Sequence, residues 1–370
     1  MSDPSVLLVH EFPGAFGGAE RYLELLGAGL TAAGIATSAV VFVDDPDAAA
    51  RLHGRLAAIA PHTEVVTGRS RPGPIRRAVR AHRPTVLHWN FVDPFAFRGA
   101  TWLLLPWGRP SVITDHLPQL RHAGPHWETT RRIANRRIAA MIVVGEAARR
   151  EAAQRWARPP AIEVVPNGVP VGAGHVRVPL ADDAAARLLF VGRLTEQKGT
   201  DLLVPVVQAV RSAGTPARLR VVGDGPMAGE LAAEVAEAGL TDEVELVGFS
   251  PNPLAEMAEA DVLLAPSTYE GLPFTPLEAL STGLPLVLSD IPSHAELVGR
   301  EGGTGVQVVS GRSPEGWAQA VARTVADLPA ASRDALELAG SHDVATMVER
   351  TVAVYRRAEA TVDGSGTASD

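Results

Sequence analysis

The sequence predicts an α/β protein with two doubly wound domains, each built on a mainly parallel sheet. Short apolar runs of strand length alternate with helical stretches along most of the chain, and such alternation is typical of parallel sheets covered by helices. The 370 residues suffice for two separate cores. Residues 1–170 carry 20 arginines, no lysine and 14 acids, whereas residues 171–370 carry 14 basic and 28 acidic residues. This change of charge sign also indicates two domains, with different partners.

Composition limits the class of protein further. With 46% hydrophobic and 21% charged residues, the chain resembles a globular protein, and no apolar run reaches transmembrane length. No signal peptide is recognisable at the N-terminus, and the lack of cysteine excludes disulfides and thiolate zinc sites. We therefore expect a cytoplasmic protein. The arginine clusters lack a nucleic-acid motif, so no nucleic acid is expected, but the basic N-terminal half permits peripheral contact with a membrane.

The first half is expected to begin with a strand over residues 5–10, a glycine-bearing loop and a helix over about 19–33. Gly17 and Gly18 would let a ligand approach the helix N-terminus, although a tight turn without a ligand explains them equally. The order strand, glycine-rich loop, helix is how a doubly wound unit starts. Further strands are predicted at 37–43, 63–67, 85–90, 110–114, 139–144 and 161–165.

Three polar residues are predicted at the carboxyl ends of these strands, where ligands of such sheets bind. They are His88, Asn90 and His116. His116 is the best placed of them because a loop of irregular composition follows it, although a lone histidine is more often structural. The one Asp-x-Asp triplet, Asp45-Pro-Asp47, precedes these positions and is interpreted as a turn.

A segment rich in proline and glycine, residues 165–187, separates the halves, and the charge changes sign across it. In the second half Thr200 is predicted to cap a helix that runs to about Ser212. Strands are predicted at 187–191, 217–222, 243–247, 261–265, 285–288 and about 305–309. The predicted divisions of the chain are 1–168, 169–342, a last helix at 343–360 and a disordered tail at 361–370.

Two cations flank the loop after the first strand of the second half. They are Arg193 and Lys198, and Lys198 is the only lysine in the chain. Two cations beside a helix N-terminus suit a diphosphate. The loop has neither the Walker pattern nor the dinucleotide fingerprint. Surface ion pairing is the simpler alternative.

Two carboxylates, Glu270 and Glu278, stand eight positions apart further along. Two prolines between them prevent one continuous helix, so a loop followed by a short helix is expected, with Thr275 as N-cap and Gly283 as its stop. Glu278 either binds a ligand or completes a capping box with Thr275. Carboxylates for ribose and sugar hydroxyls, together with cations for phosphate, indicate a sugar-nucleotide site.

The chain resembles the family 4 retaining glycosyltransferases, which have the GT-B fold. The resemblance covers nearly the whole chain and rests on Gly17-Gly-Ala-Glu-Arg21, Pro166-Asn-Gly-Val169, Gly192-Arg193 to Lys198-Gly199, Gly223-Asp-Gly-Pro226 and Glu270-x7-Glu278. It implies two Rossmann-like domains facing across a cleft. The N-terminal domain would bind the acceptor and the C-terminal domain the nucleotide sugar, and the last helix would return to the N-terminal domain.

The resemblance also implies roles for the matching residues. Arg193 and Lys198 would bind the donor diphosphate, Glu278 the ribose and Glu270 the hexose. Gly17 and Gly18 would close over the phosphate, and His116 would lie beside the sugar. The remaining donor-binding residues would be Gly248, Gly271, Leu272, Phe274 and Thr275. The family's Thr-x-His-Asp pattern is Thr114-Asp-His116-Leu117 here, without the acid after the histidine.

The expected activity is metal-independent, retaining transfer of a hexosyl group from a nucleotide-diphosphate sugar to an acceptor hydroxyl. Glu270, His116, Arg193 and Lys198 are the candidate catalytic residues. No cofactor is expected, because the cations and the helix dipole would stabilise the leaving group. The acceptor is a small molecule, a glycan or a glycolipid, selected by residues 13–16 and the 117–127 loop.

Two alternatives come from other classes. Gly223-x-Gly225 follows a strand and precedes acids about twenty residues on, which matches the pattern of an NAD-dependent oxidoreductase. A protein that binds a sugar nucleotide without turnover is the second alternative. A sugar-nucleotide epimerase would need the same donor but no acceptor.

Overall fold

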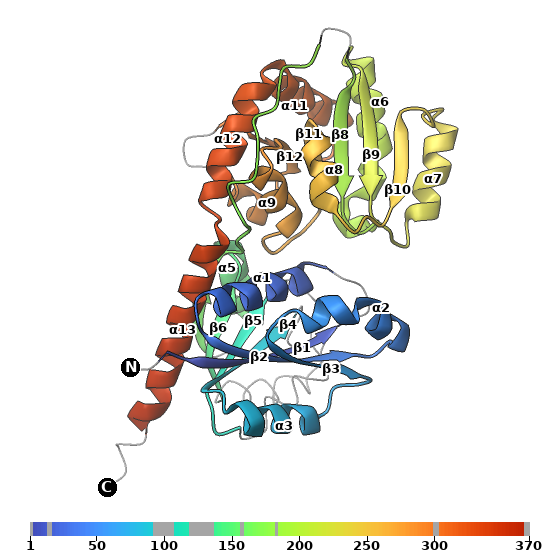
Figure 1. Ribbon diagram of the computed structural model, residues 1–370. Coiled ribbons are helices and arrows are strands. Elements are labelled where there is room, and N and C mark those ends of the chain that lie inside the picture. Colours follow the sequence, from blue (N-terminus) through green and yellow to red (C-terminus); the bar gives the residue numbers. More distant parts are fainter. Residues whose placement is uncertain are drawn as a thin grey trace. The chain divides into compact units, whose positions relative to one another are not determined.

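A computed structural model describes residues 3–12, 17–91, 107–117, 137–155, 159–181, 184–298 and 303–365. The chain divides into two compact units (Figure 1). The first contains residues 1–168 together with 344–370, and the second contains residues 169–343. None of the helices in the described part of the chain is long and apolar enough to cross a membrane.

The first unit contains a seven-stranded parallel sheet in the order β3-β2-β1-β4-β5-β6-β7. Its strands are β1 (Ser5–Phe12), β2 (Ala36–Val43), β3 (His62–Thr67), β4 (Val86–Phe91), β5 (Ser111–Asp115), β6 (Ile138–Val143) and β7 (Ala161–Val164). Each predicted strand is confirmed within about two residues. The residues of β1, β2, β5 and β6 are mostly buried, whereas those of the edge strands β3 and β7 are mostly only partly buried. The strand order reverses between β1 and β4, and loops at such a switch point form ligand sites.

The helices of the first unit are α1 (Gly18–Ala32), α2 (Pro46–Ala57), α3 (Pro72–His82), α5 (Glu146–Arg155) and α13 (Val344–Ser365). Helices α1 and α3 lie on opposite faces of the sheet (Figure 1). Helix α13 packs on α1 and on β4, β5 and β6. It continues to Ser365, so residues 361–365 are helical where the sequence predicted a tail; residues 366–370 lie outside the described part.

The second unit contains a six-stranded parallel sheet in the order β10-β9-β8-β11-β12-β13. Its strands are β8 (Ala186–Val191), β9 (Ala217–Val222), β10 (Val244–Gly248), β11 (Val262–Ala265), β12 (Leu286–Ser289) and β13 (Val306–Val309). Its switch point lies between β8 and β11, which pair directly. The loops that carry Arg193 and Lys198 and then Glu270 follow these two strands.

The α-helices of the second unit are α6 (Leu203–Ser212), α7 (Ala228–Glu237), α8 (Pro253–Glu259), α9 (Phe274–Ser281), α10 (Pro292–Ala295), α11 (Pro314–Ala326) and α12 (Leu328–Gly340). Two short 3₁₀ turns, Glu196–Lys198 and Thr200–Leu202, precede α6. The sequence predicted Thr200 as the cap of this helix. That prediction is wrong, because Thr200 is the first residue of a 3₁₀ turn. Gly199 in the left-handed conformation separates the turns, at φ +68°.

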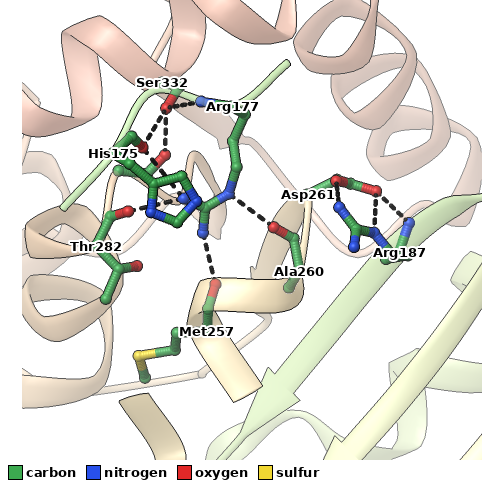
Figure 2. A network of polar contacts seen from close by, with 9 residues as sticks. His175, Arg177, Arg187, Met257, Ala260, Asp261, Thr282 and Ser332 are labelled. Atoms are coloured by element: carbon green, nitrogen blue, oxygen red, sulfur yellow. Dashed lines mark hydrogen bonds and ion pairs between the residues drawn. The ribbon is translucent and has the colours of Figure 1, made fainter. Parts of the chain in front are cut away.

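Arg177, in the segment that enters the second unit, is 4% exposed and holds the ends of two helices (Figure 2). Its guanidinium donates to the backbone oxygens of Met257 (2.6 Å) and Ala260 (2.9 Å), at the end of α8, and of Thr282 (2.7 Å), which ends α9. A cation at helix C-termini is stabilising, because the helix dipole places partial negative charge there. Burial lowers the pKa of Arg177 to about 10, which still leaves it charged at neutral pH.

Candidate functional site

Hydrogen bonds join the loops after β8 and β11 at the switch point of the second sheet. The N–H of Thr268 donates to the oxygen of Gln197 at 2.8 Å, and Nε2 of Gln197 donates to the oxygen of Tyr269 at 3.1 Å. Gly199 is required here: its φ is positive, and a Cβ would lie 2.1 Å from the oxygen of Pro266. A close approach that only glycine permits thus brings the two loops together.

Lys198 and Glu270, one from each loop, form an ion pair. Nζ of Lys198 lies 2.5 Å from Oε1 of Glu270, and their side chains are 24% and 8% exposed. Oγ of Ser267 donates to the same carboxylate oxygen at 2.9 Å. Two donors on one oxygen fix the orientation of the Glu270 carboxylate, because charge-assisted hydrogen bonds are short and directional.

A second layer of polar contacts supports Ser267. Oγ of Ser289, the last residue of β12, donates to the backbone oxygen of Ser267. Nδ1 of His294 lies 3.0 Å from the oxygen of Ser289 and must carry the hydrogen, since a carbonyl only accepts. Burial lowers the pKa of His294, so the ring is neutral. Sequence reasoning missed Ser267; its position three residues before Glu270 was the available signal.

Arg193 lies in the same loop as Lys198 and is exposed, and no ion pair of Arg193 is found among the described residues. Its loop is held by the next one: the N–H of Leu194 donates to the oxygen of Asp224 at 3.0 Å. A Cβ on Gly223 would lie 1.8 Å from the oxygen of Gly192, and one on Gly225 2.4 Å from that of Leu194. Close loop packing therefore accounts for the Gly223-x-Gly225 pattern without a dinucleotide.

Helix α9 starts earlier than predicted. Its N-cap is Pro273, without a side-chain hydrogen bond, so Thr275 is not the N-cap. Pro273 is extended, and the helix begins at Phe274, whose side chain is buried. Pro276 fits the first turn because proline lacks an N–H, and an N–H at that position would have no intrahelical acceptor. The capping-box explanation of Glu278 is therefore wrong.

The end of α9 is as predicted. Gly283 has a φ of +78°, and its N–H donates to the oxygen of Leu280 at 2.9 Å, which terminates the helix in a left-handed turn. Glu278 lies one turn into α9 and is 9% exposed.

The other candidate donor-binding residues differ in exposure. The side chains of Leu272 and Phe274 are buried, so only their backbone groups can contact a ligand, whereas Gly271 and Thr275 are partly exposed. Gly248 ends β10 with a φ of +76°, and its oxygen accepts the N–H of Gly223 at 2.8 Å.

His116 lies in the first unit, directly after β5. Its Nε2 lies 2.7 Å from Oδ1 of Asn90 in β4, so Asn90 supports the histidine from the adjacent strand. Burial, with a further contribution from His10, lowers the pKa of His116 to about 3.

The glycine turn before α1 is held by Glu20. Oε2 of Glu20 accepts the N–H of Gly17 at 2.8 Å, and Oε1 lies 2.9 Å from Nε2 of the buried His10. Burial by itself would raise the pKa of Glu20, but the hydrogen bond and charge of His10 and the N–H of Gly17 hold it below its usual value. Gly17 is the N-cap of α1, and Gly18 is its first residue. Neither Glu20 nor His10 was singled out from the sequence.

The sequence predicted His88 at the end of a strand. The structure instead places it inside β4, where it is fully buried. Its Nδ1 lies 2.5 Å from Oη of Tyr355 in α13, and its Nε2 lies 2.7 Å from Oγ1 of Thr114. Burial lowers the pKa of His88 to about 3. The neutral ring joins the last helix to the sheet, which is a structural role.

Asp45 caps α2: its side chain accepts the N–H of Asp47 at 2.9 Å. The predicted turn is thus a helix N-cap. Within the described ranges, no group of three or more histidine or carboxylate side chains could hold a metal ion. The predicted acceptor residues 13–16 and 118–127, including His122, His126 and Trp127, lie outside the described residues.

Solved structures share the architecture of this chain. The Anabaena protein HepE in complex with UDP and glucose superimposes with a TM-score of 0.73 at 19% identity, over 95% of this chain and 98% of that one. Sucrose-phosphate synthase from Thermosynechococcus elongatus gives 0.74 at 20% identity, over 96% and 100%. These likenesses show the GT-B fold, as the sequence predicted.

Sequence comparisons give the family. Residues 16–172 match the family described as Glycosyltransferase Family 4, and residues 185–327 match Glycosyl transferases group 1. The chain belongs to this family of glycosyltransferases.

Curated relatives resemble parts of the chain. The 2-deoxystreptamine glucosyltransferase of Streptomyces kanamyceticus is 32% identical over 221 residues, which is 52% of this chain and 56% of that protein. The amylovoran biosynthesis glycosyltransferase AmsK of Erwinia amylovora is 32% identical over 184 residues, 47% and 44% respectively. The chain thus spans about half the length of these relatives.

Proposed function

We propose that the chain transfers a hexosyl group from a nucleotide-diphosphate sugar to an acceptor hydroxyl, without a metal ion and with retention of configuration. The contact between Lys198 and Glu270, 2.5 Å apart at the switch point of the second sheet, carries this proposal. It places a cation suited to phosphate beside a carboxylate suited to sugar hydroxyls, at the sheet edge where ligands of this architecture bind. Family membership supports the reaction class.

Each residue has a chemical task in this reaction. Breaking a glycosyl–phosphate bond builds negative charge on the diphosphate, which Lys198, the exposed Arg193 and the N-terminus of α9 would stabilise. Glu270 would accept hydrogen bonds from hexose hydroxyls and Glu278 from the ribose. We assign His116, Gly17 and Gly18 of the first unit to the same reaction. Attack from the face of the leaving group would preserve the configuration.

A thermal-shift screen over nucleotide sugars tests donor binding, and UDP-glucose is the first candidate because the solved HepE complexes contain it. Stabilisation by a nucleotide sugar with release of the nucleotide supports the proposal. Stabilisation without turnover or donor hydrolysis would indicate the non-catalytic binding protein instead. Binding of NAD in calorimetry, without binding of any nucleotide sugar, would favour the oxidoreductase.

The acceptor and the stereochemistry need separate tests. Similarity to a 2-deoxystreptamine glucosyltransferase makes 2-deoxystreptamine the first acceptor to try, before glycans and glycolipids. The anomeric configuration of the initial product can be followed by proton NMR. An α-linked product from an α-linked donor supports retention, and a β-linked product contradicts it.

Peripheral membrane contact is proposed for the basic surface around α3. Six arginines on α3 and its flanks are exposed, and only Arg77 of them pairs with an acid, Glu64, in the described part of the chain; the six are Arg69, Arg71, Arg76, Arg77, Arg80 and Arg83. Such a surface is attracted to anionic lipid. Co-sedimentation with phosphatidylglycerol vesicles, lost after charge reversal of Arg76 and Arg80, tests it; equal sedimentation with neutral vesicles would contradict it.

A further inference from the structure

The ring of His116 is held in place by side chains of the first unit. Nε2 lies 2.7 Å from Oδ1 of Asn90, a fully buried residue of β4. The ring of Tyr22 meets the His116 ring edge-on, with 4.7 Å between the centroids. Together these contacts define both the position and the plane of the imidazole.

The orientation of the Asn90 amide follows from its other neighbour. Nδ2 of Asn90 lies 3.1 Å from the backbone oxygen of Ala19 in α1. That oxygen only accepts hydrogen bonds, so the NH₂ group of Asn90 must face it and the amide oxygen must face His116. The amide oxygen also only accepts, and therefore Nε2 of His116 carries the hydrogen.

His10 does not disturb this arrangement, although its Nδ1 lies 3.2 Å from Nδ2 of Asn90. Nε2 of His10 faces the carboxylate of Glu20, which only accepts, so Nε2 carries a hydrogen and Nδ1 of the neutral ring accepts one. The NH₂ group of Asn90 has two hydrogens and can donate to both the oxygen of Ala19 and Nδ1 of His10. Both contacts keep the amide oxygen of Asn90 on His116.

The protonation state of His116 completes the description. Burial lowers its pKa to about 3, so the ring is neutral at pH 7. A neutral imidazole with hydrogen on Nε2 has a lone pair on Nδ1. In the part of the chain that the structure describes, Nδ1 of His116 has no hydrogen-bond partner. Nδ1 is therefore an available acceptor.

We propose that Asn90 is the positioning residue that selects the Nε2–H tautomer of His116 and so makes Nδ1 an acceptor for a substrate hydroxyl. The hydrogen bond at one imidazole nitrogen determines the state of the other. Leu117, not an acid, follows His116 in this chain, and the amide of Asn90 supplies the orientation. The substrate part of this inference rests on the proposed function, to which His116 is assigned; the tautomer part does not.

Long-range ¹H–¹⁵N correlation NMR on histidine-labelled protein reads the tautomer directly, with His116→Gln to assign the signals. The wild type should show hydrogen on Nε2. Asn90→Ala should populate the Nδ1–H form, and Asn90→Asp should favour a ring protonated on both nitrogens, because a carboxylate stabilises the imidazolium. Hydrogen on Nδ1 in the wild type, or an unchanged tautomer in Asn90→Ala, would overturn the proposal.

Thr114→Val is the matched control. Thr114 is buried on the next strand and contacts His88 and Tyr22, but has no hydrogen bond to His116. Its loss should lower thermal stability while leaving the His116 tautomer unchanged. A tautomer change in Thr114→Val as large as in Asn90→Ala would show that general loosening, and not Asn90, controls the ring.

UDP-glucose hydrolysis tests the substrate part. Asn90→Ala should lower kcat roughly tenfold, as expected for loss of one buried hydrogen bond, and should have little further effect in a His116→Ala background. A changed tautomer with an unchanged kcat would leave the positioning role intact and remove His116 from the proposed reaction. A lower kcat with an unchanged tautomer would contradict the positioning role.

Discussion

The ammonium of Lys198 lies 2.5 Å from the carboxylate of Glu270, although the two residues are 72 positions apart in the chain. A pair with side chains 24% and 8% exposed is only partly screened by water. The pair holds a cation and a carboxylate ready at one point before any ligand arrives. Preorganised charge of this kind is what stabilisation of a leaving diphosphate requires.

Lys198→Ala should therefore abolish turnover of the donor while the fold is retained. The variant leaves the mostly buried carboxylate of Glu270 with Ser267 as its donor, so the Tm should fall, and circular dichroism shows whether the fold is retained. Lys198→Arg is the informative control, since a planar guanidinium cannot replace a compact ammonium. Near-normal turnover in Lys198→Ala would remove Lys198 from the proposed site.

Ser267→Ala should reduce donor turnover without weakening the fold, because it removes one of the two donors that orient Glu270. We expect a decrease in kcat of roughly tenfold, from the loss of a hydrogen bond to a charged group. Thr268→Val is a matched control: its Oγ1 donates to the oxygen of Gln197 and does not touch Glu270. Equal kinetic effects of the two substitutions would argue against the role of Ser267.

Arg177→Met should destabilise the second unit by about 3 kcal/mol or more. The substitution leaves the backbone oxygens of Met257, Ala260 and Thr282 buried without their donor, and each such loss costs about 1–3 kcal/mol. Chemical denaturation measures the effect. Arg312→Met removes an exposed ion pair with Asp201 and should cost less than about 1 kcal/mol. Similar losses in both variants would show that Arg177 is no clamp.

Stability should fall as the pH is lowered from about 6.5 towards 3. His88 and His116 have pKa values of about 3 in the fold, whereas an unfolded histidine has a pKa of about 6.5. In this window the unfolded state binds more protons, so each histidine lowers the free energy of unfolding by about 1.4 kcal/mol per pH unit.

Denaturant unfolding from pH 7 to 5 measures this slope. His88→Gln should flatten it by the share of one histidine. His53→Gln, at an exposed position of α2, should not change it. A slope unaffected by His88→Gln would mean that His88 is already protonated in the folded protein.

Turnover should continue in excess EDTA. The proposed reaction uses Arg193, Lys198 and a helix N-terminus in place of a metal ion, and Asp45 is engaged as the N-cap of α2. Asp45→Asn should be neutral for both turnover and stability, because asparagine caps a helix as well as aspartate does. Loss of activity in EDTA that Mg²⁺ or Mn²⁺ restores would contradict the metal-independent proposal.

The sequence predicted the strands well, because buried parallel strands have short, nearly continuous apolar sequences that alternate with helices. It predicted Gly283 as a stop for α9 for a similarly local reason. The start of α9 was placed at Thr275 instead of Pro273, since the choice between adjacent caps depends on which side chain the core buries. Contacts decide such a boundary, and the local sequence does not contain them.

The sequence did not show which of the candidate side chains contact each other. It offered Lys198 and Glu270 as candidates, and the structure brings them together through the pairing of β8 with β11. Asn90 was noted only as a polar residue at a strand end, and its bond to His116 depends on the register of β4 with β5. Arg177, in a segment without periodicity, gave no local sign that it would serve two helix ends.

The clamp of Arg177 on α8 and α9 determines where the chain can be cut for domain exchange. Residues 169–181 belong to the second unit. The first and last residues of that unit, Val169 and Asp343, pair with each other in a β-bridge. A chimera that took only residues 186 onward of the second unit from this protein would lack Arg177. Three backbone oxygens would then lose the guanidinium that donates hydrogen bonds to them. Modular exchange should therefore transplant residues 169–343 as one cassette and keep α13 with the recipient's first domain.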